Sequence, residues 1–212
     1  MTRKIFWEAP YKTVLSTRIA GVEGDAVTLE ETIFFAESGG QESDTGTIGG
    51  LPVRKARWEG HDIVYTLSSG HGLGPGDPVT VAIDWERRYR LMRLHFAAEV
   101  VLELVYRDFG PVEKTGAHIA ADKARIDFAW QGSIAQILLT LGARAREIID
   151  ADLPIESAFS DTTNERRYWK IDGFAQVPCG GTHLRRTGEV GPIDLKRRNP
   201  GKGRERIEIT LA

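Results

Sequence analysis

Apolar and polar residues alternate over short stretches of the first 84 residues, which predicts strands joined by tight turns. Runs of β-branched or aromatic residues occupy positions 13–20, 26–30, 32–35, 62–67 and 77–83, with glycine or acidic residues between them. Residues 44–48 and 51–58 flank Gly49-Gly50 and predict a hairpin. Strands this short and this frequent favour a small antiparallel barrel, so we predict a β-barrel-like domain over residues 1–84.

The pattern changes at Asp84, where a long helix is predicted. Asp84 is suited to cap its N-terminus and Gly110 to end it. Apolar residues lie on more than one side of this segment, so we expect the helix to be largely buried.

The remainder of the chain alternates between strand and helix patterns. Residues 117–130 predict two strands joined by a turn, and Ser133 is expected to cap a second helix. Residues 167–184 and 191–212 predict further strands. The fold class is therefore α+β, with an antiparallel sheet and helices in a second domain over residues 85–212.

Composition narrows the class of protein. The chain has 212 residues, of which 41% are hydrophobic and 27% charged, as in an ordinary globular protein. The single cysteine excludes an internal disulfide framework and fits a reducing cytoplasm. No apolar run approaches the roughly 20 residues of a membrane span, and the first residues lack the apolar core of a secretory signal. We expect a cytoplasmic protein without a membrane partner.

The net charge of −2 hides an uneven distribution. Residues 1–84 contain 7 basic and 12 acidic side chains, whereas residues 185–212 contain 8 basic and 4 acidic ones. A basic C-terminal segment is suited to phosphate contacts, although the same pattern is also typical of a solvated surface.

Two short stretches each place a pair of metal-binding side chains four positions apart. His95 and Glu99 lie in "HFAAE", and i and i+4 on a helix share one face. Cys179 and His183 lie in "CGGTH", where two glycines allow the chain to turn back. Together the four side chains make an acceptable zinc shell. Each pair by itself could equally be surface decoration or a simple turn.

Four segments resemble the freestanding alanyl-tRNA editing proteins (AlaX type), which are related to the editing domain of alanyl-tRNA synthetase. They are "TIFFAESGGQESDTGTI" (32–48), "RLHFAAEVVLEL" (93–104), "ARIDF" (124–128) and "VPCGGTHLRRTGEVGPIDLKRR" (177–198). Their order and spacing match the family along nearly the whole chain. A barrel-like N-terminal domain followed by an α+β editing domain is also what the resemblance implies.

The resemblance implies a hydrolase that removes a wrong amino acid from tRNA(Ala). The substrate would be tRNA(Ala) charged with serine, with glycine as the second candidate, and the reaction would hydrolyse the aminoacyl ester without ATP. A Zn²⁺ ion, one per chain, would be held by His95, Glu99, Cys179 and His183. Thr32 matches the family position that recognises the serine hydroxyl, and Gln41 matches the motif glutamine that lines the pocket.

Basic side chains near the C-terminus are the candidates for contacts with the acceptor end of the tRNA. They are Arg185, Arg186, Lys196, Arg197, Arg198, Lys202 and Arg204.

The chain departs from the family pattern at three positions. Glu99 stands where the family has a second helix histidine, Ser38 replaces a glycine, and Glu42 replaces a proline. A non-hydrolytic module that binds aminoacyl-tRNA or RNA with a decayed metal site is therefore an alternative, as is a relative that edits a different mischarged tRNA. Three consensus ligands, with a fourth side chain able to ligate, favour an active enzyme.

Overall fold

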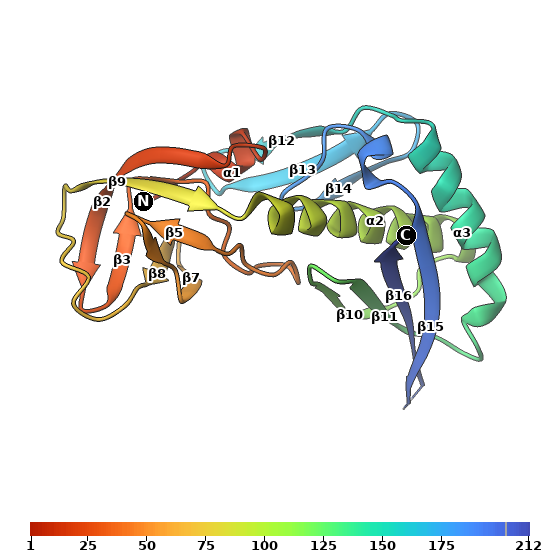
Figure 1. Cartoon of the computed structure of the whole chain (residues 1–212). Coiled ribbons are helices and arrows are strands. Elements are labelled where there is room, and N and C mark those ends of the chain that lie inside the picture. The colour runs from red at the N-terminus through yellow and green to blue at the C-terminus, as the bar shows by residue number, and fades with distance from the viewer. Residues whose placement is uncertain (202) are drawn as a thin grey trace. The chain divides into compact units, whose positions relative to one another are not determined.

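The computed structural model describes residues 1–201 and 203–212, which form an α+β protein with mainly antiparallel sheets (Figure 1). The chain divides into two compact units. Met1–Ser38 and Glu42–Tyr89 make up the first unit, and Gly39–Gln41 and Arg90–Ala212 make up the second. The short Gly39–Gln41 piece of the glycine-rich motif therefore belongs with the C-terminal part of the chain. The domain limits predicted from sequence, 1–84 and 85–212, stay a prediction.

The first unit is built around a seven-stranded antiparallel sheet with the strand order β6-β5-β9-β2-β3-β8-β7. Its strands are β2 (Val14–Glu23), β3 (Ala26–Leu29), β5 (Gly46–Ile48), β6 (Leu51–Pro52), β7 (Lys55–Glu59), β8 (Asp62–Thr66) and β9 (Pro78–Ile83). A short parallel pair joins β1 (Arg3–Lys4) to β4 (Glu31–Thr32), and the helix α1 (Ile5–Glu8) follows β1. The predicted antiparallel strands are confirmed, whereas closure of the sheet into a barrel stays a prediction.

The predicted strand over residues 32–35 is wrong beyond Thr32. Ile33, Phe34 and Phe35 are buried, but side chains bond to several of their backbone groups, and the carbonyl of Phe35 accepts from the backbone amide of Asp44, which lies outside the strands. Arg88 Nη2 donates to the carbonyl oxygen of Ile33 over 2.7 Å, and the amide of Phe35 donates to Asp44 Oδ2 over 2.7 Å. An apolar run can thus be fully buried without joining a sheet.

The predicted hairpin around Gly49-Gly50 is confirmed only close to the turn. Strand β5 pairs with β6, and both glycines have positive φ values of 59° and 78°. The second arm does not continue as predicted, because β6 ends at Pro52, which lacks an N–H for the ladder. The next strand, β7, pairs with β8 instead.

The predicted long helix is α2 (Trp85–Phe109). Asp84 caps it, because Asp84 Oδ1 accepts a hydrogen bond of 3.1 Å from the amide of Arg87. Gly110, with a φ of +85°, ends it. Its apolar side chains from Leu91 to Val105 are buried, as its sequence predicted.

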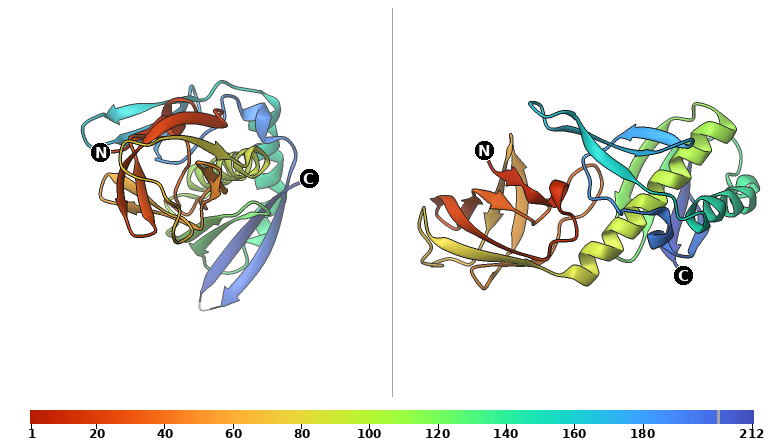
Figure 2. Two further views of the ribbon diagram at one scale, coloured as in Figure 1. Left: turned by 60° about the vertical axis from the view of Figure 1, so that its left-hand side comes forward. Right: turned by 90° about the horizontal axis from the view of Figure 1, so that it is seen from above.

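The second unit contains two antiparallel sheets. One has the strand order β10-β11-β16-β15 and consists of β10 (Lys114–Ile119), β11 (Ala124–Ala129), β15 (Ile193–Gly201) and β16 (Arg204–Leu211). The other consists of β12 (Glu156–Asp161), β13 (Arg166–Ile171) and β14 (Ala175–Pro178) in that order. Figures 1 and 2 show α2 between these two sheets, which explains why it is buried on several sides.

The helix α3 (Ala135–Asp150) lies beside β15 (Figure 1), and a 3₁₀ helix, η1 (Thr187–Val190), precedes that strand. Ser133 does not occupy the N-cap of α3 as predicted. The cap residue is Ile134, whose amide donates to Glu205 Oε2 over 3.2 Å, while Ser133 Oγ accepts from the amide of Ala135 over 3.3 Å. A carboxylate from β16 and the local serine therefore each accept one amide at the start of α3.

Within the part of the chain that the structure describes, no helix combines the length and apolar character needed to cross a membrane.

Candidate metal centre

Three side chains from two distant parts of the second unit converge. His95 lies on α2, and Cys179 and His183 lie on the turn that follows β14. One ring nitrogen of each histidine and the cysteine sulfur lie within 4.8 Å of one another. Nε2 of His95 is 3.5 Å from Sγ of Cys179, and the two histidine ring centres are 5.3 Å apart. These three residues are positioned to bind a metal ion.

Each histidine is oriented by a bond at its other ring nitrogen. Nδ1 of His95 donates to the carbonyl oxygen of Thr182 over 3.3 Å. Nδ1 of His183 is hydrogen-bonded to Oγ of Ser157, on β12, over 3.1 Å. Such partners fix the ring and are typical of metal-binding histidines.

Nε2 of His183 supplies a test of whether a metal fits. It is buried and has no hydrogen-bond partner among the described residues. A buried polar atom without a partner costs about 1–3 kcal/mol, so it is rarely left that way. A metal ion beside Cys179 and His95 would satisfy it, and nitrogen and sulfur are ligands that transition metals favour. The side chains present therefore fit a bound metal ion.

Glu99 adjoins this cluster from the next turn of α2. Its Oε1 is 3.3 Å from Nε2 of His95 and 3.7 Å from Sγ of Cys179. Its Oε2 accepts a hydrogen bond of 3.3 Å from Nε1 of Trp169. Glu99 is thus close to two of the three clustered side chains.

The electrostatic environment distinguishes the two histidines. The pKa of His183 is held well below its usual value by burial and by the neighbouring His95 and Arg167. His183 is therefore neutral and keeps a lone pair for a metal. Burial also lowers the pKa of His95, but the sulfur of Cys179 and the carboxylate of Glu99 outweigh burial and raise that pKa well above its usual value. For Glu99, burial raises the pKa, whereas His95 more than offsets burial and lowers it.

Gln41, expected to line a substrate pocket, contacts residues 179–183, which we call the metal-ligand turn. Its Nε2 donates to Thr182 Oγ1 over 2.9 Å, and its Oε1 accepts from the amide of Thr182 over 3.2 Å. Gln41 is buried, as is Thr182.

Thr32 lies in the first unit, where its hydroxyl forms hydrogen bonds within the protein. Oγ1 of Thr32 accepts a hydrogen bond of 3.0 Å from the amide of Phe34 and lies 2.7 Å from the hydroxyl of Tyr65. Because the Tyr65 hydroxyl donates to the carbonyl oxygen of Phe34, its oxygen is left to accept the proton of Thr32.

The chain is similar to known proteins along its whole length. The chain is 31% identical over 216 aligned residues to the alanyl-tRNA editing protein AlaX-M of Pyrococcus horikoshii, covering 100% of this chain and 98% of that protein. It is 32% identical to AlaX-M of Saccharolobus solfataricus, with coverage of 100% and 99%. The chain belongs to the AlaX family of alanyl-tRNA editing proteins.

One further match of this AlaX chain falls on the part that holds Cys179 and His183. Residues 170–208 match the family model described as the threonyl and alanyl tRNA synthetase second additional domain. The chain is also 35% identical to the alanine–tRNA ligase of Methanopyrus kandleri, where the alignment covers 88% of this chain and 22% of the ligase.

Three of the basic side chains proposed to contact RNA form ion pairs within the protein. Arg186 pairs with Asp152, Arg197 with Glu205 through two bonds of 2.6 and 2.7 Å, and Arg198 with Glu208. Arg185, Arg186, Lys196, Arg198 and Arg204 are exposed and Arg197 is partly exposed, so these six remain candidates for phosphate contacts. Lys202 lies outside the described residues.

The sequence analysis did not single out the residues that contact the clustered side chains and Glu99. Thr182 lies inside "CGGTH" and could have been singled out from the motif. Ser157 and Trp169 lie in strands with no local signal of a role, and only the folded chain brings them to His183 and Glu99.

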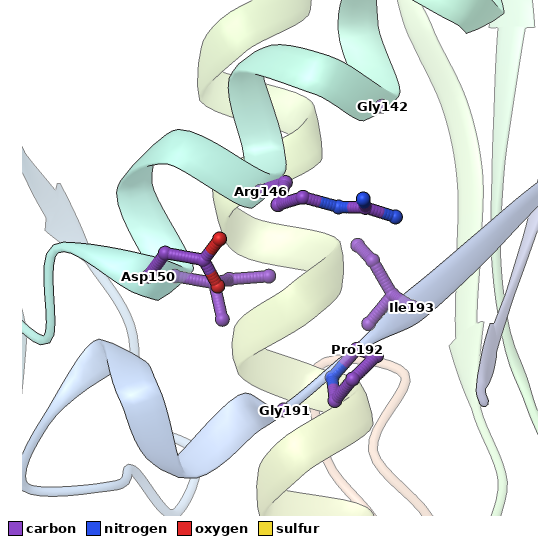
Figure 3. Close-up of a pocket in the computed structure, with 7 residues that line it drawn as sticks. Gly142, Arg146, Asp150, Gly191, Pro192 and Ile193 are labelled. Atoms are coloured by element: carbon purple, nitrogen blue, oxygen red, sulfur yellow. The ribbon is translucent and has the colours of Figure 1, made fainter.

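A separate hollow of about 300 Å³ lies between α3 and the start of β15 (Figure 3). It is lined by residues such as Arg146, Asp150 and Ile193, and it contains none of the predicted site residues. The chemistry of the convergent donor atoms, rather than the size of this hollow, identifies the candidate site.

Proposed function

We propose that this protein is a trans-editing hydrolase that deacylates mischarged tRNA(Ala), with the seryl ester as its main substrate and the glycyl ester as its second. The observation that carries the proposal is the metal-binding cluster with the buried lone pair of His183. It occurs in a chain whose relatives over their full length are named alanyl-tRNA editing proteins. Because translation supplies the substrate, we further propose a cytoplasmic location.

We propose zinc as the metal, one ion per chain, held by His95, Cys179 and His183 with Glu99 as the fourth ligand. Two imidazoles, a sulfur and a carboxylate are common zinc ligands. When bound, zinc would act as a Lewis acid that can position the substrate, polarise its carbonyl or activate water. Glu99 makes this set more anionic than one with a third histidine.

The remaining task of the protein is to orient an ester that is already activated. Holding the ester and a water molecule together lowers the barrier without any need for ATP. The structure supports this orientation, because hydrogen bonds fix Thr182, His95 and His183 in place around the cluster.

We propose that Thr32 recognises the serine hydroxyl. A hydroxyl has two lone pairs, of which the Thr32 oxygen uses one for the amide of Phe34. The other can accept a hydrogen bond from serine. Alanine would leave that lone pair without a partner, which favours hydrolysis of the seryl ester over the alanyl ester.

The finer architecture belongs to the same proposal. We propose that residues 1–84 form the barrel-like domain with the glycine-rich motif and that residues 85–212 form the editing domain. The seven-stranded sheet supports the barrel-like domain. The cluster of His95, on α2, with Cys179 and His183, on the metal-ligand turn, supports the editing domain.

Contacts with the acceptor end would come from the basic C-terminal side chains. Exposed Lys196 and Arg204 lie on neighbouring strands β15 and β16 and can reach phosphates without breaking a buried pair. Neutralising either should weaken RNA binding and reduce its salt dependence.

The direct experiment incubates the protein with tRNA(Ala) charged with serine, glycine or alanine and measures release of each amino acid. We expect rapid release of serine, slower release of glycine and little release of alanine. Binding of the charged tRNA without release would support the non-hydrolytic module instead. Release from a different mischarged tRNA alone would support a relative with another substrate.

A further inference from the structure

Both ends of the Gln41 side-chain amide bond to one residue of the metal-ligand turn. Its amide nitrogen donates to the hydroxyl of Thr182 over 2.9 Å, and its amide oxygen accepts from the backbone amide of Thr182 over 3.2 Å. Only 1% of Gln41 is exposed. These two bonds indicate that Gln41 fixes the position of Thr182 rather than binding the substrate.

The backbone around Gln41 is fixed to β10. The amide of Ile119 donates to the carbonyl oxygen of Gly40 over 2.7 Å, and Gln41 forms a parallel bridge with Ile119. Gly40 has a φ of +89°, and a Cβ there would lie 2.9 Å from the carbonyl oxygen of Ala117. Only glycine allows the loop to approach the strand this closely. Gln41 therefore projects from a rigid base.

Thr182 connects Gln41 to both histidines. Its carbonyl oxygen accepts the hydrogen bond from Nδ1 of His95, and His183 follows it directly in the chain. The turn is also packed tightly, because a Cβ on Gly181 would lie 2.9 Å from Gln41 Oε1 and 2.2 Å from Cε1 of His95. A shift of Thr182 would turn the ring of His95 and displace His183 together.

We propose that Gln41 is a positioning residue of the metal centre, which acts through Thr182 to hold His95 and His183 in the orientation that binds the ion. This assigns Gln41 a role different from lining the substrate pocket. The inference rests on the proposed metal binding, but not on the identity of the substrate. Outer-shell partners of metal ligands typically contribute 10- to 100-fold in metal affinity.

The test measures zinc affinity without tRNA, by competition with a chelator of known affinity. Gln41→Met keeps the length of the side chain and removes both hydrogen bonds. We expect it to raise the zinc dissociation constant by about 10- to 100-fold. Gln136→Met is the matched control, because Gln136 is exposed on α3 and should leave the constant unchanged.

A double-mutant cycle tests the route through Thr182. Thr182→Val removes the hydroxyl partner and by itself should weaken zinc binding in the same direction, which also gives a readout if Gln41→Met folds poorly. The double variant should bind zinc no more weakly than Gln41→Met alone, because Gln41→Met has already lost the hydroxyl bond that Thr182→Val removes.

Gln41→Glu separates positioning from substrate binding. A carboxylate can accept from the amide and from the hydroxyl of Thr182, since that hydroxyl can rotate and donate. We expect this variant to bind zinc at least as tightly as the parent.

Zinc binding by Gln41→Met equal to the parent's, or losses that multiply in the double variant, would overturn the inference while leaving the proposed hydrolysis intact. A parent that binds no zinc would overturn both the inference and the metal assignment. A parent that binds zinc but releases no amino acid from any charged tRNA would contradict the proposed function alone.

Discussion

The indole Nε1 of Trp169 donates a hydrogen bond of 3.3 Å to Oε2 of Glu99. Trp169 is fully buried on β13, so this bond fixes one carboxylate oxygen in place. The other oxygen, Oε1, faces Nε2 of His95 over 3.3 Å. A supported carboxylate with its other oxygen directed at the cluster is the arrangement expected of a ligand, which is why we propose Glu99 as the fourth one.

Glu99→Ala should weaken zinc retention by at least tenfold and lower deacylation, because three ligands and an open position remain. Glu99→His should bind zinc about as well as the parent, since imidazole is among the common zinc ligands. Metal content and seryl-tRNA(Ala) deacylation are measured on the same preparations. Glu103→Ala, one turn further along α2, is the control. If Glu99→Ala matched the parent in both measurements, Glu99 would not be a working ligand.

Gly181→Ala should impair the metal centre, whereas Gly180→Ala should not. A Cβ on Gly181 would lie 2.2 Å from Cε1 of His95, a distance that forces the ring or the turn to move. A Cβ on Gly180 meets nothing within 4 Å. Zinc affinity measured by chelator competition should fall at least tenfold for Gly181→Ala only. Equal affinities in the two variants would mean that the packing of this turn does not control the site.

Thr32→Val should reduce the preference for serine. Losing a matched hydrogen bond costs on the order of 1–3 kcal/mol, or roughly tenfold to a hundredfold in rate. The change also leaves the amide of Phe34 and the hydroxyl of Tyr65 short of a partner, so thermal unfolding is measured in parallel. Thr32→Ser keeps the hydroxyl and should retain the selectivity. Unchanged discrimination between seryl and alanyl esters in Thr32→Val would assign Thr32 a purely structural role.

Arg88→Met should destabilise the protein strongly. Arg88 is fully buried and pairs with Asp44, while its Nη1 donates to the carbonyl oxygen of Pro10 over 3.1 Å. Removing it leaves a buried carboxylate without its cation, a change that costs about 3–5 kcal/mol in free energy of unfolding. Urea denaturation measures the loss.

The adjacent Arg87→Met provides the control for this stability prediction. Arg87 pairs with Glu42 over 2.6 Å, but both side chains are partly exposed, at 25% and 28%. Its loss should cost about 1 kcal/mol or less. Similar losses in the two variants would mean that burial of the Arg88–Asp44 pair adds nothing to its contribution.

The elements and ligands that could be predicted are those specified by local patterns. Asp84 and Gly110 define the ends of α2 through cap and stop chemistry that acts within one turn. The grouping of His95 with Cys179 and His183 was predictable because each pair has a recognisable spacing and the motifs resemble those of a known family.

What the sequence could not predict depends on contacts between distant segments. Nothing near Phe35 indicates that Asp44 and not a neighbouring strand will satisfy its amide. Nothing near Ile134 indicates that Glu205, from the last strand, will accept its N–H. The same is true of Ser157, whose bond to His183 exists only after β12 has docked beside the ligand turn.

The most direct test of the central claim is a zinc titration of metal-depleted protein with deacylation of seryl-tRNA(Ala) as the readout. The parent should be inactive after chelation and should recover activity linearly until about one zinc per chain, because one cluster holds one ion. Cys179→Ala, which removes the sulfur ligand, should recover little at the same zinc concentrations. Full activity in the metal-depleted parent, or no release of serine at any zinc concentration, would contradict a zinc-dependent editing hydrolase.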